Sequence, residues 1–308
     1  MEDESNATFI TFSGYVEVYR YRFVYFVVMF TVYILIICSN LSIVGLIWIH
    51  QNLHEPMYIF IAALLMNSIL YCANIYPKVL IDILSEKQII TYQACLVQCF
   101  LYYSLSGSEL LVLAAMAYDR YLSICKPLQY PTIMRKTTIC SVLSLAWIVP
   151  ACQVAVPVVL SADTKLCNFV LKGIFCNNSA YKLHCMSSRS LSVYGVVVLV
   201  NVVFLPMVFI LFTYTKIFLI TYQKCGAVRR KAAQTCLPHL LVLMNFSCLV
   251  TYDVIIVKLE SDFPTTVRLI MTLQMILYHP LFNPIIYGLK MKEISKHLKR
   301  LFFQHKLQ

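Results

Sequence analysis

Long apolar stretches restrict the folds open to this chain more than any other feature. A helix needs about 20 apolar residues to cross the hydrocarbon core of a bilayer. Stretches of that length are expected as helices at 23–49, 56–80, 93–125, 139–160, 190–222, 235–258 and 265–288. Only 13% of the residues are charged, against about 25% in a soluble domain. A transmembrane β-barrel would show short alternating strands instead, so the sequence predicts an all-α membrane protein with a seven-transmembrane helix bundle.

The regions outside these stretches are short, and no separate soluble domain is expected. Residues 1–22 form a polar N-terminal tail without the early apolar segment of a cleavable signal peptide. The helical domain covers 23–289. In the last segment, 290–308, apolar residues recur among lysines at helical spacing, which predicts an amphipathic helix lying on the inner leaflet.

The basic residues give the chain a formal net charge of +11, and their distribution predicts its orientation. With the N-terminus outside, most of the 25 Lys and Arg residues fall in cytoplasmic segments and the tail, as the positive-inside rule requires. The basic inner rim suits anionic lipid, and no nucleic-acid partner is needed to explain it. Asn6 begins a glycosylation sequon, which agrees with an extracellular tail.

Four of the thirteen cysteines lie in segments expected on the extracellular side, where disulfides persist. They are Cys95, Cys167, Cys176 and Cys185. Four thiols allow three pairings, and the sequence alone leaves these open.

Polar residues inside the apolar stretches are candidates for structural or functional contacts. Asn40 and Ser68 lie within the first two expected helices, and Glu109 lies in the middle of the third. Glu109 could contribute to an ion site. The alternative is a neutral carboxyl held by Ser68, Asn283 or neighbouring hydroxyls, because a buried carboxylate without a partner charge tends to take up a proton.

Residues 116–130, MAYDRYLSICKPLQY, close the third apolar stretch and end at a helix-stopping proline. Asp119 and Arg120 taken alone could mark a solvated helix end. The whole string, however, resembles the third-helix signature of odorant receptors, within the rhodopsin-like G-protein-coupled receptors. Three further segments are similar to motifs of the same family: LHEPMY at 53–58, KAAQTCLPH at 231–239 and PLFNPIIY at 280–287. Some details, such as the segment 65–78, look closer to fish-type members.

The resemblance implies roles for particular residues. In related receptors an acid of the second helix joins the region of Glu109 in an ion-binding pocket, whereas Ser68 stands at that position here. Asp119 would hold Arg120 in the resting state, and a helix-6 movement would free the arginine and open a cavity for a G protein. The activation residues carried over are Asp119, Arg120, Tyr121, Tyr214, Asn283, Pro284 and Tyr287. Pro238 stands where the family usually has serine, so the local hydrogen bonding there must differ. The resemblance also implies the disulfides Cys95–Cys176 and Cys167–Cys185.

A ligand pocket is expected between the third, fifth, sixth and seventh helices near the outer third of the bundle. The expected lining residues are Tyr102, Tyr103, Ser106, Gly107, Val198, Asn201, Val202, Ser247, Thr251, Val254, Lys258, Leu273 and Ile276. A mostly apolar lining with few polar anchors suits a small organic ligand, although these side chains could equally be helix packing. Lys258 could pair with a ligand carboxylate, snorkel to the outer surface, or pair with Asp253.

The family resemblance implies an odorant receptor that binds a small molecule, needs no cofactor, and activates a stimulatory olfactory-type G protein. The expected location is the plasma membrane of olfactory neuron cilia. A non-olfactory metabolite receptor remains the alternative within the class. A secondary transporter would show internal repeats, and none is found; an enzyme would need a nucleophile–base pair or a metal cluster.

Overall fold

The computed structural model describes residues 8–15, 18–186, 189–222, 236–237, 240–244 and 264–304. Within that part of the chain, six helical segments are long and apolar enough to cross a membrane. The sixth of the seven expected helices, 235–258, lies outside the described residues except at 236–237 and 240–244. The protein is an all-α membrane protein whose helices form a bundle.

The spanning helices follow one another along the chain. They are α1 (Val18–Ile49), α2 (Pro56–Leu84), α3 (Tyr92–Cys125), α5 (Lys136–Ser161), α6 (Arg189–Leu199) continuing into α7 (Leu205–Tyr222), and α9 (Thr265–Lys290). A π-helical turn at Val200–Phe204 joins α6 to α7. Short helices are α4 (Tyr130–Ile133) and α10 (Lys292–Gln304), with 3-10 turns at Gln51–Leu53 and Asn178–Leu183.

Two helix boundaries differ from the sequence-based expectation more than the others do. α1 begins at Val18, five residues before the expected start, and Tyr21 has non-helical backbone angles (φ −123°, ψ 20°). α2 continues past Pro77 to Leu84 instead of ending near Leu80. A proline inside a helix removes one hydrogen bond, but burial of the following residues Val79, Asp82 and Ile83 keeps the last turns packed.

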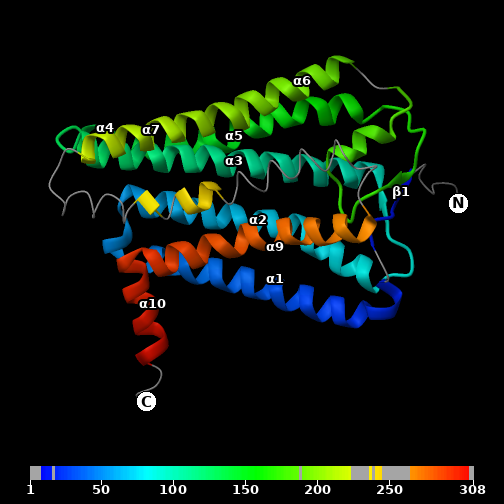
Figure 1. Cartoon of the computed structure of the whole chain (residues 1–308), viewed down its shortest axis with the longest axis horizontal. Helices are drawn as coiled ribbons and strands as arrows, with labels where there is room; N and C mark the ends of the chain where they lie inside the picture. The colour runs from blue at the N-terminus through cyan, green and yellow to red at the C-terminus, as the bar shows by residue number, and fades with distance from the viewer. Residues whose placement is uncertain are drawn as a thin grey trace, which may run out of the picture.

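α3 occupies the middle of the bundle, between α2 and α5 (Figure 1). The other spanning helices run roughly alongside it, so the bundle has two ends (Figure 1). The end that carries the first strand is called the disulfide end, and the end that carries α10 is called the switch end (Figure 1). The N-terminal strand and the C-terminal helix therefore lie at opposite ends of the molecule.

A small β-sheet, which the sequence did not predict, covers the disulfide end. β1 (Phe9–Phe12) is its central strand, between β2 (Ile89–Thr91) and β3 (Val170–Leu171). β1 pairs antiparallel with β2 and parallel with β3. Alternate side chains of a strand point to opposite faces; Ile10 and Phe12 are buried against the bundle, whereas Phe9 is 52% exposed.

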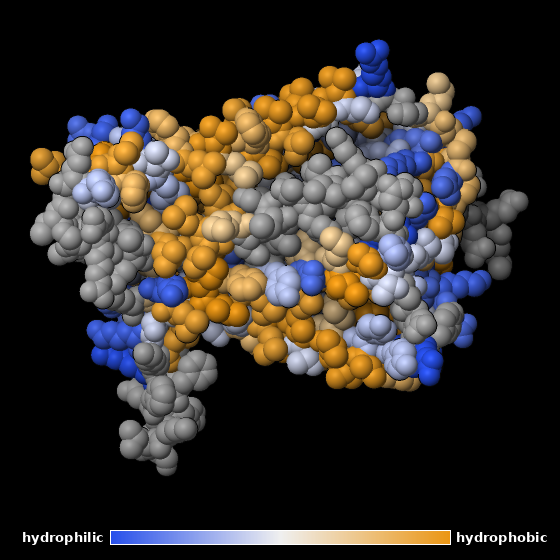
Figure 2. Space-filling view, viewed as in Figure 1, coloured by the Kyte–Doolittle hydropathy of each residue, from blue (hydrophilic) through white to orange (hydrophobic). Residues whose placement is uncertain are grey.

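The sides of the bundle are apolar where a soluble protein would be polar. Figure 2 shows hydrophobic residues over the middle of the bundle and hydrophilic residues gathered toward its two ends. In the most apolar stretch of α5, and likewise of the α6–α7 segment, only 17% of the residues are buried inside the protein. These exposed faces have the composition that contact with lipid tails requires, which agrees with a multi-pass membrane protein.

Candidate functional site

The switch end contains a cluster of three polar side chains around Asp119. The Asp119 carboxylate is fully buried in the part of α3 that lies at the switch end. Arg120 Nε donates to Asp119 Oδ2 at 3.0 Å, and the hydroxyl of Tyr130 donates to Asp119 Oδ1 at 2.8 Å. Both carboxylate oxygens therefore accept hydrogen bonds, and a buried charge needs such partners to be stable.

Tyr130 is a member of this cluster that the sequence analysis did not single out. It belongs to α4, eleven residues after Asp119 and beyond Pro127, so helical spacing could not place it beside the carboxylate. Burial raises the pKa of the Tyr130 hydroxyl, and the Asp119 charge and hydrogen bond raise it further. The phenol consequently keeps its proton and acts as a donor to Asp119 at neutral pH.

Three other residues assigned to activation belong to, or pack against, the hydrophobic cluster at the switch end. Tyr214 and Tyr287 are both buried in the hydrophobic cluster at the switch end, together with Met116. Tyr121 packs against the edge of the same cluster. In the part of the chain that the structure describes, the buried hydroxyl of Tyr214 has no hydrogen-bond partner, so it could accept or donate a new bond without breaking an existing one.

A buried polar centre lies between the two ends and connects α2, α3 and α9. Asn283 Nδ2 lies 3.1 Å from Ser68 Oγ and 3.0 Å from Glu109 Oε1, donating to both. All three side chains are buried. The structure thus brings together the residues that the sequence analysis offered as partners for Glu109.

A second buried amide compensates for the prolines of α9. Pro284 has no N–H, so the carbonyl of Pro280, four residues earlier, loses its helical partner. Asn40 Nδ2 donates to that carbonyl at 3.1 Å, and also to Ile36 O of its own helix at 2.8 Å. Asn40 therefore fixes α1 against the segment of α9 that Pro284 makes deformable.

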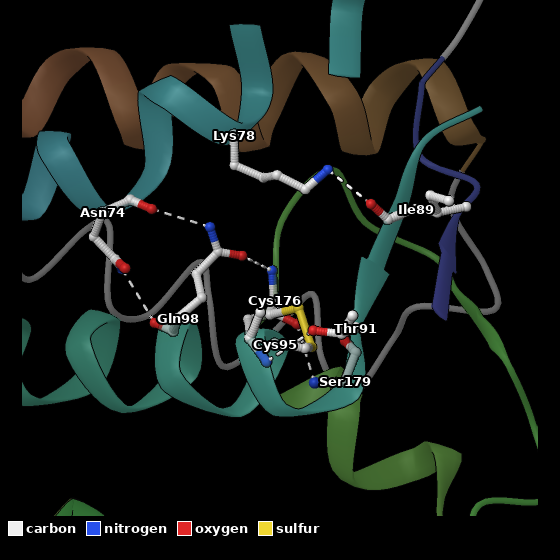
Figure 3. Close-up of a disulfide and its surroundings, with 10 residues drawn as sticks. Asn74, Lys78, Ile89, Thr91, Cys95, Gln98, Cys176 and Ser179 are labelled. Carbon is white, nitrogen blue, oxygen red and sulfur yellow. Dashed lines mark hydrogen bonds between the residues drawn. A yellow bond between two sulfur atoms is a disulfide. The ribbon is translucent and has the colours of Figure 1, made fainter. Parts of the chain in front are cut away.

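Two disulfides hold the loop between α5 and α6 at the opposite end. Cys95, at the start of α3, is bonded to Cys176, and Cys167 is bonded to Cys185. These are the pairs that the family resemblance implied. Figure 3 shows the first disulfide beside Gln98 and Asn74, with Lys78 donating to the Ile89 carbonyl nearby.

Four of the residues expected to contact ligand lie in one buried cluster near the disulfide end. Tyr102 and Ile276 are buried there, and Tyr103 and Leu273 pack against them. The ring of Tyr102 lies 5.1 Å from that of Phe175, and its hydroxyl lies 3.6 Å from the sulfur of Met275. This cluster is mostly apolar and contains a few phenol hydroxyls, the combination that suits small organic ligands.

Gly107 and Val202 form a helix-packing contact on the other side of α3. A Cβ atom added at Gly107 would lie 2.5 Å from Val202 Cγ1 and 2.9 Å from Pro150 Cβ. Only glycine allows α3, α5 and the π-helical turn to approach this closely. Ser106 donates to the Tyr102 carbonyl within α3, Val198 is half-buried and Asn201 is exposed. Their assignment to the ligand site stays a prediction.

Several expected site residues lie outside the described residues. They are Asn6, Ser247, Thr251, Val254 and Lys258. Among the described residues near the disulfide end, an apolar crevice is lined by Tyr15, Ile174, Leu269 and Leu273, among others. Its volume of about 20 Å³ is enough for roughly one water molecule, so it is smaller than an odorant.

Comparison with known proteins agrees with this geometry. The family model described as "Olfactory receptor" matches residues 29–305. The chain is 32% identical to human olfactory receptor 11A1 over 294 residues, covering 94% of this chain and 91% of the relative. It is 33% identical to human olfactory receptor 2A5 over 281 residues, covering 89% of each. These relatives are human, so the similarity to fish-type members stays an expectation. The chain belongs to the olfactory receptor family of rhodopsin-like G-protein-coupled receptors, and it is a receptor and not an enzyme.

Proposed function

We propose that the receptor binds a small organic odorant near the disulfide end and transmits its binding along α3 to a stimulatory G protein at the switch end. The observation that carries the proposal is the course of α3, which runs without a break from Tyr92 to Cys125. One helix thus carries Tyr102 in the aromatic cluster, Glu109 in the polar centre and Asp119 in the switch cluster.

The ligand class follows from the chemistry of the Tyr102 cluster. Aromatic and aliphatic side chains offer an apolar surface, and phenol hydroxyls offer a few directional contacts. Lys258 and Asp253 extend the proposal to carboxylate or amino-acid-like odorants, since a lysine can pair with a carboxylate and an aspartate with an amine. The remaining lining residues of the sequence analysis are retained in this proposal.

The proposed G-protein surface is the segment that follows α3. Leu128 is 95% exposed and stands between Lys126 and Arg135, whose side chains are also exposed. A single exposed leucine with basic neighbours could insert into an apolar pocket on a partner whose rim is acidic. In this proposal, 1–22 and the disulfide end face the outside, 23–289 forms the receptor domain, and 290–308 lies on the cytoplasmic leaflet.

The proposal is tested by expressing the receptor with a surface tag in cells that carry a cyclic AMP reporter. Amino acids, carboxylic acids, amines and alcohols are applied as a panel. We expect a dose-dependent rise in cyclic AMP for at least one compound, absent in cells without the stimulatory Gα subunit and absent for Arg120→Ala. A surface-expressed receptor whose ligand response survives loss of that subunit would overturn the coupling.

Applied to the Lys258→Ala variant, the same panel tests whether Lys258 pairs with a ligand carboxylate. If Lys258 binds the ligand carboxylate, the substitution weakens responses to acids and spares responses to neutral odorants. An unchanged response to acids would remove this part of the proposal and leave the receptor function intact.

A further inference from the structure

Gln98 is a buried polar residue at the disulfide end to which the activation motifs give no role. It lies in α3, three residues after Cys95, and only 5% of its surface is exposed. A buried amide is costly unless its donors and acceptors are paired, and both ends of this one are engaged. Nε2 donates to the Asn74 carbonyl at 3.0 Å, and Oε1 accepts from the Cys176 backbone N–H at 2.9 Å.

Asn74 completes a closed pair of contacts between α2 and α3. Its Nδ2 donates to the Gln98 carbonyl at 3.1 Å, so each residue's side chain bonds the other's backbone. Figure 3 shows the two amides side by side, with Gln98 reaching from α3 toward the loop nitrogen of Cys176. Two helices consequently hold the Gln98 amide in one orientation, and that orientation aims Oε1 at the loop.

The loop atoms that Gln98 reaches belong to the segment that covers the ligand cluster. Residues 174 and 175 precede Cys176 and are buried in the cluster that contains Tyr102 and Ile276. We call 174–176 the roof segment. The Phe175 ring contacts the Tyr102 ring, and the carbonyl of Ile174 accepts a hydrogen bond from the Tyr15 hydroxyl at 3.1 Å.

The disulfide alone does not orient the roof segment. Cys95 and Cys176 are joined through rotatable side-chain bonds, which limit their separation but leave the loop backbone free to turn. The Gln98 bond acts on the backbone itself, directly beside Phe175. A second backbone contact follows, in which the Tyr103 hydroxyl accepts from the Asn178 N–H at 3.0 Å.

We propose that Gln98 is a specificity-determining positioning residue, whose amide, held by Asn74, sets the height of Phe175 above the odorant. This inference rests on the proposed function, because it assumes that the ligand lies beneath the roof segment. It concerns the selection of ligand and not the switch, so signalling efficiency at saturating ligand should be preserved when Gln98 changes.

The first arm of the test replaces Gln98 with a residue of similar volume that cannot form either bond. Gln98→Met is compared with Ser108→Ala, a buried polar substitution in the same helix. The Ser108 hydroxyl donates to the Ser104 carbonyl of its own helix. Ligands are a homologous series of increasing chain length built on an agonist from the panel. We expect potency in Gln98→Met to shift about tenfold, the effect of losing one or two buried hydrogen bonds, and by different amounts for short and long ligands.

The control variant should keep the wild-type order of potencies, and both variants should reach the wild-type maximum. An unchanged order in Gln98→Met at normal surface expression overturns the inference while leaving the receptor function in place. A wild-type receptor that responds to no compound removes the proposed function instead.

The second arm needs no variant and therefore does not depend on whether Gln98→Met reaches the cell surface. Amide hydrogen exchange is measured across the α5–α6 loop of the purified wild-type receptor. The Cys176 N–H is expected to exchange at least about tenfold more slowly than the amides of exposed loop residues, because a buried hydrogen bond must open first. Exchange as fast as at exposed positions would show that Gln98 does not hold the roof segment.

Discussion

The hydrogen bond from Tyr130 to Asp119 can be removed by deleting one oxygen atom, and Tyr130→Phe should raise signalling in the absence of ligand. The bond is 2.8 Å long and its acceptor is a fully buried carboxylate. A hydrogen bond to a charged group contributes about 1.5–3 kcal/mol. If opening of the switch breaks this bond, its loss shifts the equilibrium toward the open state by about tenfold to a hundredfold.

The assay is basal cyclic AMP in cells, divided by the amount of receptor at the surface. Before the substitution, the open state is a minor species of about 0.1–10% of the receptor. A shift of the equilibrium by about tenfold or more raises that population severalfold at least, and basal cyclic AMP should rise with it. Tyr118→Phe is the matched control, because Tyr118 lies on the outer face of α3 and packs near Phe209. The Tyr118 side chain is 36% exposed and takes no part in the bonds to the Asp119 carboxylate, which come from Arg120 and Tyr130.

Basal signalling equal to wild type in Tyr130→Phe would refute the reasoning, because the bond would then contribute equally to both states. The same rise in Tyr118→Phe would show a general effect of losing a hydroxyl. Arg120 keeps its bonds to Asp119 in both variants, so any difference between them belongs to the tyrosine.

Three further outcomes follow from the same structure. Replacing Cys167 and Cys185 by serine opens a ring whose cysteines have a sequence separation of 18. The loss of this disulfide should lower the free energy of unfolding by about 3 kcal/mol and the Tm of the purified receptor by several degrees. An unchanged Tm would contradict this prediction. Leu128→Ala should weaken G-protein coupling about tenfold or more, because it removes up to about 3 kcal/mol of apolar burial in the interface. Ligand affinity measured without G protein should be unchanged. Coupling equal to that of wild type would exclude Leu128 from the interface. Burial lowers the pKa of His184, so the unfolded chain binds this proton more readily. The contribution of neutral His184 to the free energy of unfolding should therefore be fully present above about pH 6.5 and be lost as the pH falls below it. The fall in Tm at low pH should be smaller in His184→Gln.

The spanning helices could be predicted because apolar length is a local property of the sequence. The roles of Asp119, Asn283 and Glu109 could be proposed because helical spacing and family motifs place them within the bundle. The four disulfide cysteines could be identified from their place in segments expected outside the membrane, although their pairing came from the family resemblance.

The features that were missed depend on contacts between distant parts of the chain. β1 is four residues long, too short to show a clear period, and it forms only because β2 and β3 lie on either side of it. Tyr130 lies beyond a proline, and Gln98 reads as an ordinary helical residue until the loop folds over it. Short strands and buried amides are specified by their partners, which single-sequence periodicity does not reveal.

The central claim is that ligand bound near one end of α3 releases the switch cluster at the other end. Its most direct test is nucleotide exchange by a purified stimulatory G protein, added to the receptor in lipid nanodiscs with an agonist from the panel. We predict that agonist accelerates exchange on wild type and that Arg120→Ala binds the agonist but does not accelerate exchange. Agonist binding to wild type without faster exchange, or equal acceleration by Arg120→Ala, would contradict the account.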